Sequence, residues 1–181
     1  MNKFIISIIS LALFGICSFS YAQNKQAFGF DDRGLYCAQD EDKDYAVFEM
    51  PDLSANQIKG SLYTKLTSMY KSPKDVITNI SDSIIQLEGY ASHVYYSETK
   101  NAMDFSFNII IQIKDGKVRY DIPNITQIFM LDVPILGTAR FNMEKPLSSL
   151  VDNESDRLHV ANYFNNLVDE LNNSIRATDD W

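Results

Sequence analysis

The sequence predicts an α+β domain in which two helices pack on one face of an antiparallel sheet. Two observations indicate the helices: an apolar stripe of helical period begins after residue 54, and a second one ends before residue 176. A third indicates the sheet, because β-forming segments separated by turn signals lie between the stripes. Of the 181 residues, 45% are apolar and 12% aromatic. That content excludes a disordered acidic chain, which lacks the aromatic residues of a core.

Residues 1–22 have the layout of a secretory signal peptide. Lys3 precedes an apolar run of about 14 residues, and the small residues Ser20 and Ala22 predict cleavage after Ala22. The run is shorter than the ~20 residues that span a bilayer. We therefore expect an exported protein, periplasmic or secreted, with no transmembrane segment in the mature chain.

Two other interpretations of this segment stay open. The first is a retained N-terminal membrane anchor, and the second is the signal of a lipoprotein acylated at Cys17. The second is disfavoured because Ile16 stands where a lipoprotein signal has a small residue. Cleavage removes Lys3, so 15 basic residues face 24 acidic ones and the formal charge goes from −8 to −9.

Residues 23–44 are interpreted as an acidic, polar and solvated N-terminal segment. Its last residues, 40–44, resemble the start of a calcium loop, but Tyr45 stands in place of the required glycine and Pro51 in place of the closing glutamate. No Cys–His spacing suits zinc. We therefore expect no metal and no cofactor.

Cys37 is the one cysteine left after removal of the signal. Free cysteine is among the most buried residue types, so a packing role is the favoured interpretation. The alternative is an intermolecular contact through Cys37.

The domain proper is predicted to span residues 45–176, with 177–181 as a C-terminal tail. It opens with a short strand, Tyr45–Met50, ended by Pro51. Ser54 and Gln57 then form a capping box that begins a helix. The helix has an apolar stripe at Ile58, Leu62, Leu66 and Met69, and Pro73 prevents its continuation.

Four or five strands are expected next. Residues 75–80 form one strand, and Ile84–Tyr96 form a long one in which Gly89 marks a bulge or bend. The turn between them contains Asp82-Ser83-Ile84, which resembles a short bacterial O-glycosylation acceptor.

Asp115-Gly116 predicts a hairpin with a type I′ turn between strands 104–114 and 117–122. A two-residue loop pairs Lys114 with Lys117. Every inward pair is then apolar: Ile113 with Val118, Ile111 with Tyr120 and Ile109 with Ile122.

Residues 124–131 form a further strand and residues 132–150 an irregular segment. A second helix is predicted over Glu154–Arg176, capped by Asp152 or Asn153. Its core-facing stripe consists of Val160, Ala161, Phe164, Leu167, Val168, Leu171 and Ile175.

A family resemblance rests on the helix and hairpin just described. The segments Leu62–Lys65, Tyr70–Ile77 and Ile113–Tyr120, with the Tyr-Lys-x-Pro turn and the Lys-Asp-Gly hairpin, resemble a family of exported bacterial domains of unknown function with a TATA-binding-protein-like (TBP-like) fold. The resemblance covers roughly residues 45–125. It implies a TBP-like β-α-β(4)-α topology with a curved antiparallel sheet, and it implies no catalytic residues.

Charge argues against a nucleic-acid partner despite the fold name. A surface that grips a duplex neutralises phosphates with Lys and Arg, whereas the mature chain is acidic. The local basic group of Lys114, Lys117 and Arg119 is interleaved with Asp115 and Asp121. We interpret that group as a solvated strand face.

The leading hypothesis is a non-catalytic exported domain that binds a protein or a cell-envelope component. One alternative is a carrier of a small apolar ligand with a cavity between the sheet and the second helix. Another is a hydrolase that uses His93, whereas His159 is expected to be exposed and inert. The candidate ligand-binding residues are Tyr90, His93, Tyr95, Tyr96 and Tyr120.

Overall fold

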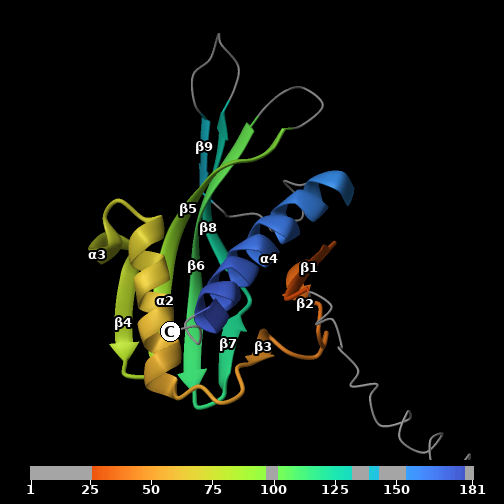
Figure 1. The fold of residues 1–181 in the computed structure, drawn as a ribbon. Helices are drawn as coiled ribbons and strands as arrows, with labels where there is room; N and C mark the ends of the chain where they lie inside the picture. Colours follow the sequence, from red (N-terminus) through yellow and green to blue (C-terminus); the bar gives the residue numbers. More distant parts are fainter. Residues whose placement is uncertain (1–25, 97–101, 132–138, 143–153, 178–181) are drawn as a thin grey trace, which may run out of the picture.

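The computed structural model describes residues 26–96, 102–131, 139–142 and 154–177. A seven-stranded antiparallel sheet has the two long helices, α2 (Ala55–Met69) and α4 (Glu154–Arg176), on one face, as Figure 1 shows. The predicted α+β class is confirmed. The strands are β3 (Tyr45–Glu49), β4 (Ile77–Ser81), β5 (Ile84–Tyr96), β6 (Ala102–Lys114), β7 (Lys117–Asp121), β8 (Asn124–Leu131) and β9 (Ala139–Asn142).

The sheet has the order β3-β7-β6-β5-β4, and β6 is its central strand. Along β6, the C-terminal part pairs with β7 and the N-terminal part pairs with β8. Ile122 and Pro123 separate β7 from β8, and proline cannot donate a hydrogen bond to a sheet ladder. The two strands therefore extend one after the other along the same neighbour.

Helix α2 (Ala55–Met69) begins at the predicted capping box. The Ser54 backbone N–H donates to Gln57 Oε1 at 2.9 Å, and the Gln57 N–H donates to Ser54 Oγ at 3.4 Å. The Ala55 N–H donates to Asp115 Oδ1, at 2.7 Å, in the turn between β6 and β7. A carboxylate at a helix N-terminus is favourable, so this distant turn adds to the local cap.

Gly60 lies exposed on α2, and a Cβ there would meet no atom within 4 Å. We expect Gly60→Ala to raise the free energy of unfolding by about 1 kcal/mol, because alanine favours a helix over glycine by that amount. Urea unfolding followed by circular dichroism measures the effect. A urea midpoint of Gly60→Ala below that of wild type would contradict the conclusion that a side chain at residue 60 meets no other atom.

The β6–β7 hairpin has the predicted register over the pairs Ile113–Val118, Gln112–Arg119 and Ile111–Tyr120. Its turn differs from the predicted type I′. That type needs a positive φ at both central residues, whereas Gly116 has a φ of 72° and Asp115 is not among the residues with positive φ. The Asp115 side chain instead reaches back to α2.

Gly89 is not the site of the irregularity in β5. The β5–β6 pairing runs unbroken from Ile84 through Gly89, and the register shifts between Ala91 and Tyr95. Gly89 is opposite Phe107, and a Cβ on Gly89 would come within 2.2 Å of the Phe107 ring. Glycine is required here by a ring packed against the backbone.

The structure differs from the prediction in two segments, the strand predicted over residues 75–80 and the irregular segment 132–150. Pro73 starts a single helical turn, α3 (Pro73–Val76), so the strand predicted from residue 75 begins only at Ile77. Within residues 132–150, expected to be irregular, residues 139–142 form β9 and pair with β8. The predicted cap at Asp152 or Asn153 lies outside the described residues, as do Ala22 and Cys17.

The segment 23–44 is more than the solvated lead-in that its charge predicts. It contains a hairpin of β1 (Phe28–Asp31) and β2 (Gly34–Cys37), which lies beside α4 in Figure 1. Asn165 of α4 anchors it. Its Oδ1 accepts from the N–H groups of Ala27 and Phe28, and its Nδ2 donates to the Phe28 carbonyl, all at 2.9 Å. Cys37 of this hairpin is free and fully buried, as the packing interpretation expects.

Helix α4 (Glu154–Arg176) has the predicted bounds, and all seven residues of its predicted stripe are buried. Between α4 and the sheet, Phe105 and Phe107 of β6 meet Tyr163 and Phe164 with ring centroids 5.1–5.8 Å apart. Most of these pairs are edge to face, an arrangement that stabilises aromatic clusters beyond burial alone. This cluster is the centre of the core.

Candidate functional site

The sheet face opposite the helices is the candidate site. Within the described ranges no helix covers it, since α2 and α4 both lie on the other side (Figure 1). Side chains alternate along the described parts of β5 and β6. The odd-numbered residues of 85–91 and 103–113 are buried, and the even-numbered ones of 84–90 and 106–114 are partly or fully exposed on the other face, where Asp104 is the buried exception. We call this outward surface the open face.

Among the described residues, Tyr90 is an exposed aromatic side chain of the open face, with 53% of its surface accessible. Its hydroxyl donates to Asp104 Oδ2 at 2.5 Å, and Asp104 is only 3% exposed. Tyr90 is opposite Ser106 in the β5–β6 register, so Asp104 is its diagonal neighbour. A short bond to a buried carboxylate thus holds an exposed ring in one orientation.

A cavity of about 480 Å³ lies beside Tyr90, where β4 begins and the upper edge of β5 is unpaired. The only charged residues in its lining are the exposed carboxylates Asp75 and Glu88. The full lining is Tyr70, Asp75, Val76, Glu88, Gly89, Tyr90, Ser106, Phe107, Asn108 and Thr126. We call it the Tyr90 cavity. Carboxylates, hydroxyls and an amide suit hydrogen-bond donors and cations.

A smaller cleft of about 230 Å³ lies at the other end of the open face. Its charged lining residues are all basic, and the lining is Tyr45, Val47, Gln112, Lys114, Lys117 and Arg119. We call it the basic cleft. The Arg119 guanidinium lies 3.7 Å above the Tyr45 ring centre, and its Nε donates to Asp121 at 2.7 Å. Stacking and this bond hold the guanidinium in place.

The interleaved acids do not neutralise the basic cleft as the sequence suggests. Asp115 accepts from the Ala55 N–H at the start of α2, on the helix side of the hairpin. Asp121 is engaged by Arg119. Among the described residues, neither Lys114 nor Lys117 has an ion pair within 4.0 Å.

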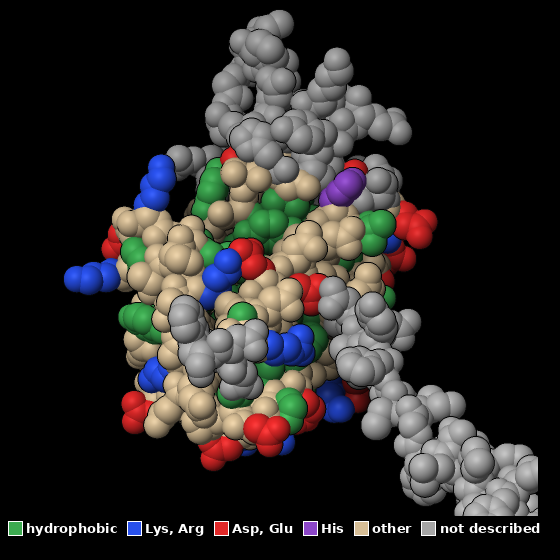
Figure 2. Space-filling view, viewed as in Figure 1, with side chains coloured by type: hydrophobic (Ala, Val, Ile, Leu, Met, Phe, Trp, Pro, Cys, Tyr) green, Lys and Arg blue, Asp and Glu red, His purple; other side chains and the backbone are tan. Residues whose placement is uncertain are grey.

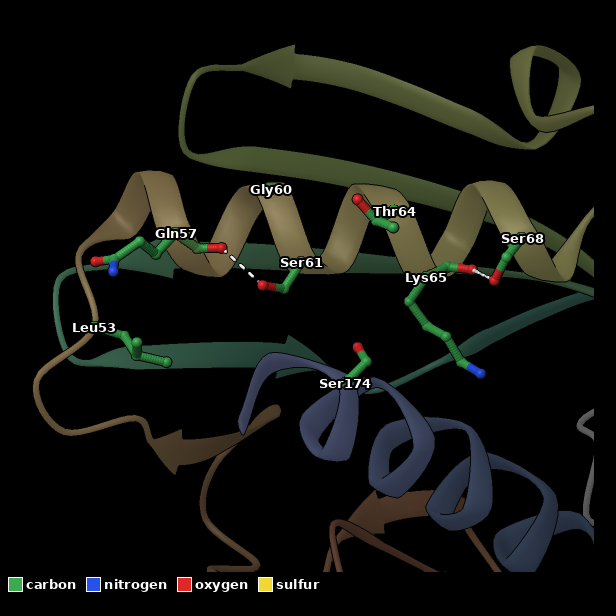
Figure 3. Close-up of a pocket in the computed structure, with 8 residues that line it drawn as sticks. All are labelled: Leu53, Gln57, Gly60, Ser61, Thr64, Lys65, Ser68 and Ser174. Carbon is green, nitrogen blue, oxygen red and sulfur yellow. Dashed lines mark hydrogen bonds between the residues drawn. The ribbon is translucent and has the colours of Figure 1, made fainter. Parts of the chain in front are cut away.

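A third cavity, the groove between α2 and α4, is a weaker candidate. It has a volume of about 500 Å³ and is lined mainly by small polar residues of α2 with Ser174 of α4 (Figure 3). Its serines donate to carbonyls of their own helices: Ser61 to Gln57, Ser68 to Lys65 and Ser174 to Leu171. Lys65 is paired with Glu170 at 2.5 Å. The groove therefore offers few polar groups for a ligand.

The structure places two of the predicted tyrosines, Tyr90 and Tyr120, on opposite faces of the sheet. Tyr120 faces the helices, is fully buried and donates to Asn172 Oδ1 at 2.9 Å, whereas Tyr90 lies on the open face. Burial raises the pKa of Tyr120 far above its usual value. The backbone of His93, Tyr95 and Tyr96 belongs to β5, and their side chains lie outside the description.

The remaining predictions concern catalysis and an apolar ligand. His159 is exposed on α4, as expected. Seen from the helix side, hydrophobic side chains gather between α2 and α4 and charges of both signs are scattered around them (Figure 2). Beneath α4 the rings of Phe105 and Phe164 are fully buried, with centroids 5.6 Å apart.

The described residues also bear on metal binding and on membrane insertion. No cluster of three or more His, Cys, Asp or Glu side chains is arranged to hold a metal ion there. No helix in that part of the chain has the length and apolar character to cross a membrane. Sequence reasoning singled out Tyr90 but missed Asp104 and the stacked Tyr45–Arg119 pair, although the hairpin register already placed Lys114 opposite Lys117.

Comparison with solved structures identifies the fold. A TBP-like protein from Parabacteroides distasonis superposes with a TM-score of 0.54 and 10% identity, over 73% of this chain and 90% of that one. A DUF4468 family protein from Bacteroides ovatus gives a TM-score of 0.45 and 11% identity, over 72% and 84%. No protein-family model and no curated protein matches the sequence. The TBP-like fold expected from the resemblance is therefore confirmed.

Proposed function

We propose that this TBP-like domain is a non-catalytic binding domain, exported by residues 1–22, that binds a protein partner with its open face. The observation that carries the proposal is the exposed Tyr90 ring fixed by the buried Asp104. Tyrosine is enriched among the residues that dominate protein interfaces. A ring already held in one orientation loses less conformational entropy when a partner binds.

The spacing of the two cavities favours a macromolecule over a small ligand. Ser106 lines the Tyr90 cavity and Gln112 lines the basic cleft, both on β6. Six residues of strand separate them, roughly 20 Å at about 3.3 Å per residue. One small ligand does not fill both, whereas a protein interface of about 800 Å² per partner spans this distance.

The charges of the open face also suit a protein. The Tyr90 cavity has carboxylates in its lining and the basic cleft has ammonium and guanidinium groups. Between them lie the partly buried Ile110 and, on β5, Gln86. This centre has no charged residue and has charges of both signs around it, and depletion of charge at the centre is typical of specific interfaces.

Substitution of Tyr90 tests the proposal. Tagged mature protein captures its partner from the native cell-envelope fraction, and Tyr90→Ala is expected to reduce that capture at least about tenfold, as an interface hot spot does. Quantitative mass spectrometry of the captured proteins measures the loss. The matched control is Tyr63→Ala, because Tyr63 is 41% exposed but lies on α2; it is expected to leave capture unchanged.

A second variant separates binding from folding. Tyr90→Phe keeps the ring and removes the hydroxyl that donates to Asp104. We expect it to weaken capture less than Tyr90→Ala. Equal capture by wild type and a folded Tyr90→Ala protein, or loss of capture with Tyr63→Ala alone, would contradict the proposal.

A further inference from the structure

The basic cleft contains an arrangement with an unfavourable energy in the free protein. Lys114 and Lys117 are directly opposite each other across the β6–β7 pairing, and both are exposed on the open face. Like charges that face each other across two strands destabilise the pair. Arg119 is next along the same face of β7 and adds a third positive charge.

The neighbouring acids leave these lysines without a counter-ion among the described residues. Asp115, which lies between them in sequence, is bonded to the α2 N-terminus. Glu49 is opposite Lys117 in the β3–β7 register, yet no ion pair within 4.0 Å joins them. Asp121 and Asp44 are near Arg119, at 2.7 and 3.8 Å. The two ammonium groups therefore face the cleft with hydrogen-bond donors available.

We propose that the basic cleft binds an acidic side chain, Asp or Glu, of an extended acidic segment of the partner protein. The carboxylate bonds to Lys114 and Lys117 and relieves their mutual repulsion, while Arg119 and Tyr45 form the wall beside it. The inference rests on the proposed function, since it names the partner's chemistry at one end of the open face.

The size of the cleft favours a side chain over a free ligand. Pockets for small molecules usually measure about 300–1,000 Å³, whereas this cleft measures about 230 Å³. It holds one carboxylate-bearing side chain and leaves the rest of the segment on the sheet surface. The lysines contribute charge-assisted bonds, which are about twice as strong as neutral ones.

Binding of a fluorescein-labelled oligoglutamate peptide to the purified full chain, followed by fluorescence anisotropy, tests the inference. Wild type is expected to bind, and binding is expected to weaken with added salt because the lysines are exposed. The double variant Lys114→Gln/Lys117→Gln is expected to bind about tenfold more weakly. Lys114→Arg/Lys117→Arg is expected to retain binding.

Matched controls separate this cleft from general charge. Lys71→Gln/Lys74→Gln changes the net charge equally on exposed residues near the end of α2 and is expected to leave affinity unchanged. Inorganic phosphate and phosphatidylglycerol vesicles are measured in parallel. The inference is overturned if the control pair weakens binding equally, if the Lys114→Gln/Lys117→Gln variant binds the peptide as tightly as wild type, or if only phosphate or vesicles bind.

The two proposals fail in distinguishable ways. The peptide measurement needs no native partner and does not involve Tyr90. If Tyr90→Ala leaves capture unchanged while the peptide still binds, only the proposed function is contradicted. Lack of peptide binding with a clear Tyr90 effect contradicts the acidic segment alone.

Discussion

Asn165→Ala is expected to lower the free energy of unfolding by about 3 kcal/mol. The substitution leaves the Ala27 and Phe28 N–H groups and the Phe28 carbonyl without the partner that each has at 2.9 Å. Ala27 and Phe28 are almost fully buried, so water does not replace the amide while the hairpin stays in place. A buried polar group that loses its partner costs roughly 1–3 kcal/mol.

The matched control is the next residue. Asn166 also lies on α4 but is exposed, so Asn166→Ala is expected to change stability by less than about 0.5 kcal/mol. Chemical unfolding followed by circular dichroism measures both variants. Equal midpoints for the two would contradict the anchoring role of Asn165.

Cys37 supplies a second readout of the same hairpin. Its thiol is buried, and with Cys17→Ser as background it is the one cysteine that a thiol reagent can label. We expect Asn165→Ala to accelerate labelling because β1 and β2 then separate from α4 more often. Asn166→Ala is expected to label at the wild-type rate.

Gly89→Ala is expected to destabilise the protein by about 2–3 kcal/mol. The added methyl group would lie 2.2 Å from Phe107 Cζ, far inside van der Waals contact. The Phe107 ring is packed against Tyr163 and Phe164, so its displacement disturbs the aromatic cluster of the core. Overpacking of a core usually costs about 1–3 kcal/mol.

Two further variants test the cause. Gly60→Ala makes the same chemical change at a glycine without contacts and has the opposite expected sign. Phe107→Leu reduces the ring that the new methyl group meets, so the double variant Gly89→Ala/Phe107→Leu should lose less stability than the sum of the single losses. Additive losses would show that the two positions do not interact.

Much of the fold followed from short-range signals in the sequence. The capping box at Ser54 and Gln57 predicted the start of α2, because its partners are three residues apart. The predicted bounds of α4 agree with the structure, and every residue that was named for its apolar stripe is buried. Apolar pairing and a two-residue loop predicted the register of β6 with β7.

The candidate site was predictable only in part. Tyr90 was singled out as an aromatic residue on a strand, but nothing local indicates that Asp104, on the next strand, fixes its hydroxyl. Tyr120 was grouped with Tyr90 by residue type, and the structure separates the two by sheet face. The charge of the hairpin was judged from neighbours in sequence, which counted Asp115 with the lysines. In the structure the Asp115 carboxylate accepts from the Ala55 N–H at the start of α2, 60 residues away.

By itself, the sequence determined the two helices, the central hairpin and the α+β class, because each depends on residues within one helical turn or one strand pair. Only the tertiary structure decided that the acidic segment 23–44 contributes a hairpin packed on α4. It also decided that no acid of the described residues lies within ion-pair distance of Lys114 or Lys117, although Glu49 is opposite Lys117. Those outcomes depend on single bonds between distant residues, such as Asn165 with Phe28 across 137 positions. Such bonds form because a buried polar group must find a partner wherever packing brings one near.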